Sequence, residues 1–77
     1  METHTGSTFI TYLDIEMKTL ITGQKDGLYK SRTVVGVVLN RRNQVVQKFA
    51  DDKISEADYW KAIEILDETE QLGLYGY

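Results

Sequence analysis

The sequence predicts an α+β fold in which a small antiparallel sheet packs against two helices. Residues 33–50 contain two valine-rich runs separated by Asn40-Arg41-Arg42-Asn43, a pattern typical of two strands joined by a tight turn. An acidic segment with a strong helix-capping residue follows at once and predicts a helix over 55–72. The chain of 77 residues is expected to form one domain with a single core. Within it, residues 1–7 are expected to be flexible and residues 73–77 to form an apolar tail.

The segment over residues 8–22 fits two secondary structures. With a period of two, it places apolar residues on one face, at Phe9, Leu13, Ile15, Met17 and Ile21. With a helical period, it forms one apolar stripe, at Phe9, Tyr12, Leu13, Met17, Leu20 and Ile21. Its many β-branched residues favour a strand, whereas its length, about twice that of an average strand, favours a helix. A helix is the preferred interpretation, and a three-stranded meander with one helix stays open as the alternative.

The hairpin over residues 33–50 is the centre of the predicted sheet. Residues 33–39 are apolar on both faces, which is typical of a central strand covered on each side. Gly36 inside this run predicts a bulge or a close backbone approach. Residues 45–49 alternate in the second strand, and residues 28–31 either begin a third strand or remain a loop.

The C-terminal helix has clear start and stop signals. Ser55 is expected to be the N-cap, and Glu56 and Asp58 place negative charge in the first turn, where it complements the helix dipole. Gly73 suits the position after the last helical residue and predicts an end near Leu72. The expected core takes apolar residues from every element: Phe9, Leu13, Met17, Leu20, Val35, Val37, Leu39, Val45, Phe49, Tyr59, Ile63 and Leu66.

The composition argues against several classes of function. The chain has no cysteine and one histidine, so neither disulfides nor a dedicated zinc site is expected. No P-loop, GxSxG, HExxH or EF-hand pattern is present, and we expect neither an enzyme nor a cofactor. A net charge of −3 and a pI near 5.0 argue against general affinity for nucleic acid or anionic lipid. The N-terminus lacks a signal peptide, and no apolar run approaches the length of a membrane span, so a cytoplasmic protein is expected.

Two groups of residues are candidates for partner binding. Arg41 and Arg42 lie at the predicted hairpin tip, and arginine forks match phosphate and carboxylate groups. Trp60, Tyr75 and Tyr77 form the second group, because tyrosine and tryptophan are enriched at binding hot spots. The plainer alternatives are a solvated turn whose charges blunt edge pairing, a tryptophan at the edge of the core, and a tail folded over the domain.

The expected order of helix, strands and helix resembles that of double-stranded-RNA-binding domains and of small head-to-tail joining proteins of tailed phages. The first family opens its second helix with a lysine-rich motif, whereas the matching stretch Ser55-Glu56-Ala57-Asp58 carries the opposite charge, which argues against RNA binding.

The leading hypothesis is a small non-catalytic protein–protein interaction module that binds another protein or itself. A phage or mobile-element regulator of a host protein is its narrower form. Two alternatives stay open: a nucleic-acid-binding module that uses the basic hairpin, and a structural subunit of a larger assembly.

Overall fold

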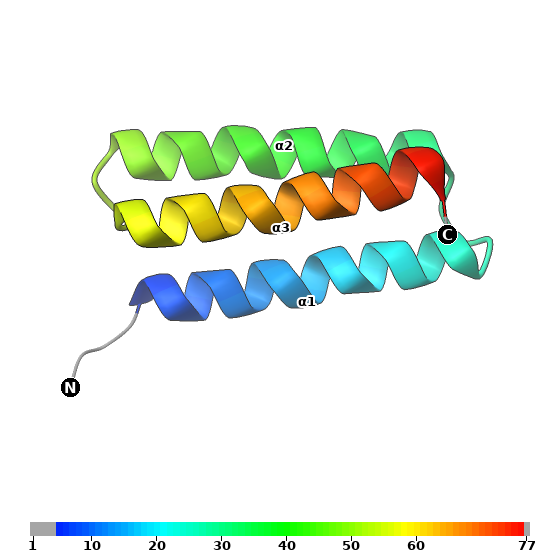
Figure 1. The fold of residues 1–77 in the computed structure, drawn as a ribbon, viewed down its shortest axis with the longest axis horizontal. Coiled ribbons are helices and arrows are strands. Elements are labelled where there is room, and N and C mark those ends of the chain that lie inside the picture. The colour runs from blue at the N-terminus through cyan, green and yellow to red at the C-terminus, as the bar shows by residue number, and fades with distance from the viewer. Residues whose placement is uncertain (1–4, 77) are drawn as a thin grey trace.

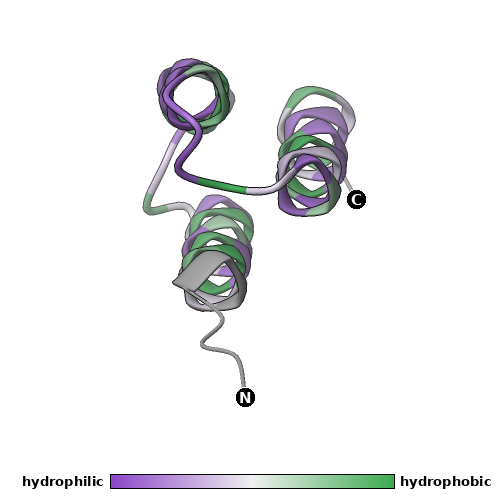
Figure 2. Cartoon of the chain, turned by 90° about the vertical axis from the view of Figure 1, so that its left-hand side faces the viewer, coloured by the Kyte–Doolittle hydropathy of each residue, from purple (hydrophilic) through white to green (hydrophobic). Residues whose placement is uncertain are grey.

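Three long helices make up the part of the chain that the structure describes. The computed structural model describes residues 5–76, with side chains from residue 8 onward, and in this range it contains α1 (Thr5–Lys25), α2 (Ser31–Ala50) and α3 (Glu56–Tyr75). Consecutive helices run in opposite directions, so that α1 and α3 are parallel (Figure 1). Seen end-on, the helices stand at the corners of a triangle (Figure 2). Helix α3 packs against both other helices, which touch each other less extensively.

The predicted sheet is wrong, because residues 33–50 lie within α2 and the described part of the chain contains no strand. Asn40-Arg41-Arg42-Asn43 is the middle of this helix rather than a hairpin tip, and Gly36 is a helical residue rather than a bulge. Valine-rich runs have high strand propensity, but their apolar positions also recur with helical spacing, and packing on α3 decides between the two periods. The resemblances to the two families rested on an order of helix, strands and helix. Because the described residues contain no strand, these resemblances are not supported.

The first and the last helix extend beyond their predicted ends. Residues 8–22 lie within α1, so this segment is a helix and not a strand. Ser55 caps α3, because its Oγ accepts a hydrogen bond from the backbone N–H of Asp58 at 3.1 Å. Helix α3 continues past Leu72 as far as Tyr75 and ends at Gly76, whose φ is 80°. Of residues 1–7, which were expected to be flexible, residues 5–7 form the start of α1 and residues 1–4 lie outside the described residues.

The core follows helical periodicity along the whole bundle. Helix α2 contributes Val34, Val38 and Val45, which are fully buried, whereas Leu39 of the expected core is 48% exposed. A strand would have turned residues 35, 37 and 39 inward, but a helix turns residues that are three or four apart to one side. The buried apolar residues are Ile10, Leu13, Met17, Val34, Val38, Val45, Ile54, Ala62 and Leu66.

Replacing Gly36 by alanine is expected to stabilise the protein. Gly36 lies inside α2, and a Cβ built at this position meets nothing within 4 Å. Glycine costs about 1 kcal/mol relative to alanine in a helix interior, so Gly36→Ala should raise the free energy of unfolding in urea by about that amount. Gly73→Ala is the matched control, because its Cβ would lie 3.0 Å from Cγ1 of buried Val34 and the crowding offsets the gain. Equal effects of the two substitutions would contradict the packing described here.

Candidate functional site

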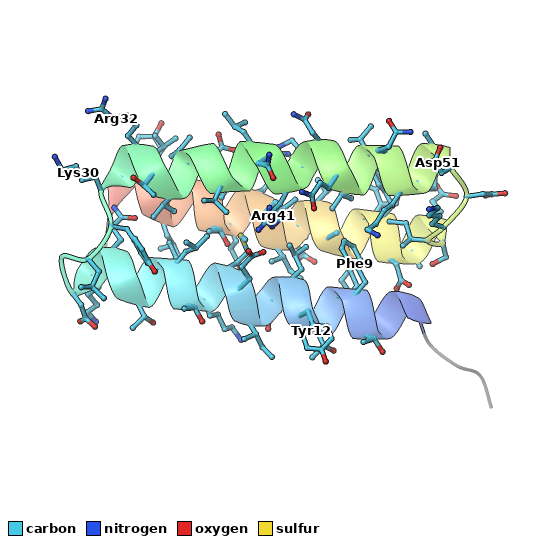
Figure 3. The ribbon with its side chains drawn as sticks, turned by 180° about the vertical axis from the view of Figure 1, so that it is seen from behind. Phe9, Tyr12, Lys30, Arg32, Arg41 and Asp51 are labelled. Carbon is cyan, nitrogen blue, oxygen red and sulfur yellow. The ribbon has the colours of Figure 1, made fainter. Side chains whose placement is uncertain are left out.

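Arg41 connects α2 to α1 through a two-pronged ion pair with Glu16. Its Nε lies 2.8 Å from Oε1 and its Nη2 lies 2.6 Å from Oε2, which is the parallel geometry that makes arginine–carboxylate pairs specific. Figure 3 shows Arg41 between the two helices on this side of the bundle. The hydrogen bonds to Glu16 raise the pKa of Arg41, and attraction to the carboxylate adds to the effect, while desolvation opposes it. An arginine is protonated at every physiological pH, so the role of the pair is to join the two helices.

Arg42 connects α2 to α3 on the other side of the same helix. Its Nη2 lies 2.9 Å from a carboxylate oxygen of Asp67 and 2.9 Å from one of Glu70. The side chains of Arg42 and Glu70 are both about three-quarters buried. Arg41 and Arg42 therefore point to different neighbouring helices, and each is already paired with carboxylates of its own chain.

The predicted aromatic site residues are not brought together. Trp60 is 58% exposed near the start of α3, where its Nε1 lies 3.4 Å from Oε2 of Glu56. Tyr75 is 78% exposed at the last residue of α3. Fifteen residues of helix separate them, which corresponds to about 22 Å along the axis. Tyr77, the third predicted aromatic residue, lies outside the described residues.

A line of exposed apolar side chains runs along α2 beside α3. Leu39 is 48% exposed, Val46 is 47% exposed and Phe49 is 39% exposed, while Val35 is half-buried in the same line. Together with Arg42, these residues follow one another at intervals of four, three, four and three. This is the heptad spacing of residues that face a packing partner along a helix.

Helix α3 carries a second line with the same spacing on the flank that adjoins α2. Trp60, half-buried Ile63 and 48% exposed Leu74 are its apolar members. Asp67 and Glu70 complete the intervals of three, four, three and four. The two lines together form the α2–α3 stripe, which we define by its apolar residues: Val35, Leu39, Val46, Phe49, Trp60, Ile63 and Leu74.

The middle of the α2–α3 stripe is polar and both of its halves are apolar. The ion pairs of Arg42 with Asp67 and Glu70 form the polar centre. At one end, the ring of Phe49 stacks on Tyr59 with 4.5 Å between centroids. Tyr59 in turn meets the edge of Trp60 at 4.9 Å. The aromatic cluster therefore connects the two lines at this end of the stripe.

Sequence reasoning found single members of this surface but not the surface itself. It placed Val35, Leu39 and Phe49 in the core and Trp60 at a binding site, and it did not single out Val46. The heptad spacing was present in the sequence, but a strand interpretation of residues 33–50 conceals it, because the period of a strand groups residue 35 with residue 37.

A second groove lies between the C-terminal half of α1 and the loop that leads into α2. Ile15, Leu28 and Tyr29 line it together with Lys18 and Asp26. The ring of Tyr29 covers Gly23 and leaves no room for a Cβ at this position. Tyr29 thus serves to pack the loop onto α1, and most of the α1 residues that line the groove are polar, including Lys18, Thr19 and Thr22.

Within the described residues, no three or more acidic, histidine or cysteine side chains gather in a way that could hold a metal ion. None of the described helices is both long enough and apolar enough to cross a lipid bilayer. Comparisons of the chain with protein-family models, with curated proteins and with solved structures found no match.

Proposed function

We propose that this protein is a non-catalytic protein–protein interaction module that binds its partner through the α2–α3 stripe. One observation carries the proposal: Leu39, Val46, Trp60 and Leu74 are each about half exposed on one surface at heptad spacing. Scattered apolar side chains are ordinary on protein surfaces, but a continuous rimmed patch marks an interaction site. The regular spacing suits a partner that is itself helical, since knobs at this interval fit between the side chains of a facing helix.

The polar centre of the stripe supports a specific partner over indiscriminate apolar contact. Arg42 is paired with both Asp67 and Glu70, so the cation at the centre of the stripe is not isolated. A polar group at one position of a heptad line selects the register of packing. A protein partner is favoured over the nucleic-acid alternative, because two of the five basic residues which that alternative would use, Arg41 and Arg42, are paired with carboxylates of the same chain. The other three are Lys30, Arg32 and Lys48.

Site-specific photo-crosslinking in the native lysate tests the proposal. A photoreactive phenylalanine analogue at Leu39 is expected to crosslink to a polypeptide, because this position lies within the stripe. The matched control places the same analogue at Asn40, the next residue, which is exposed and points about 100° away around the helix. Crosslinking at residue 39 but not at residue 40 is the expected result. Absence of any crosslinked polypeptide at residue 39, or equal yields at both positions, would exclude the stripe as the binding surface.

A further inference from the structure

We draw no further inference here: the strongest candidate, the surface patch of half-exposed apolar side chains that the α2–α3 stripe presents on one side of the bundle, belongs to the site already described, and nothing in the structure shows what covers it.

Discussion

Leu66→Ala is expected to lower the free energy of unfolding by about 2–5 kcal/mol, the range for truncating a fully buried leucine. Leu66 is 0% exposed and belongs to the cluster that joins all three helices. The substitution removes buried apolar surface and leaves a cavity that α1 and α2 cannot fill without moving. Because small domains have about 5–15 kcal/mol of stability in total, the loss should be large enough to see directly. Urea unfolding followed by circular dichroism at one fixed protein concentration measures it.

Leu28→Ala is the matched control for this change. Leu28 is 74% exposed in the loop between α1 and α2, so the same truncation removes little buried surface. Its effect should lie within about 0.5 kcal/mol, as for surface substitutions in general. A similar loss for both variants would mean that residue 66 does not lie in the core as described.

Asn40→Pro is expected to cost about 3 kcal/mol or more, because residue 40 lies in the interior of α2. Proline removes a backbone hydrogen bond of the helix, and its ring clashes with the carbonyl four residues before it. Asn40 is exposed, so the substitution disturbs the backbone and not the core. The expected result is a sharp fall in the urea midpoint together with a loss of helical circular dichroism. This experiment separates the two structures of residues 33–50, since a turn at residues 40–43 would accept proline readily.

Asn40→Ala shows how much of that effect belongs to the side chain. The side-chain oxygen of Asn40 accepts hydrogen bonds from Arg41 Nη1 at 2.8 Å and from Gln44 Nε2 at 3.0 Å. These are exposed contacts of small net value, and alanine has the higher helix propensity. We expect a change within about 0.5 kcal/mol. If proline proved as mild as alanine at this position, the helical assignment of α2 would have to be abandoned.

Local signals in the sequence predicted one helix well and misplaced the fold class. Ser55 and the acidic residues after it indicate the start of α3, because helix capping depends only on a few neighbouring residues and their backbone geometry. The end of α3 was misplaced because Gly73, which resembles a stop signal, is buried inside the helix and lets Val34 approach closely. A glycine near the end of a helix either stops the helix or lies inside it and lets another element approach. Its neighbours in the folded structure decide between these two roles.

Helix α2 shows why the fold class itself escaped prediction. Its inner residues 34, 38, 41, 45 and 48 and its outer residues 35, 39, 42, 46 and 49 form two heptad lines displaced by one position. Two adjacent apolar lines put valines next to each other along the chain, and such runs are also the mark of a buried strand. The candidate site also escaped prediction, because the outer line of residues shares one face only when the segment is a helix.

The sequence by itself determined the size of the domain, its acidic balance, the capped start of α3 and the apolar character of residues 8–22 and 33–50. Only the tertiary structure decided that the latter segment is a helix, that Arg41 binds Glu16 while Arg42 binds Asp67 and Glu70, and that a line of apolar residues stays outside. The physical reason is that ion pairs and burial join residues distant in sequence. A segment whose apolar residues fit both a strand and a helix adopts the structure whose apolar face is covered by another element. In this protein α3 covers the apolar face of α2.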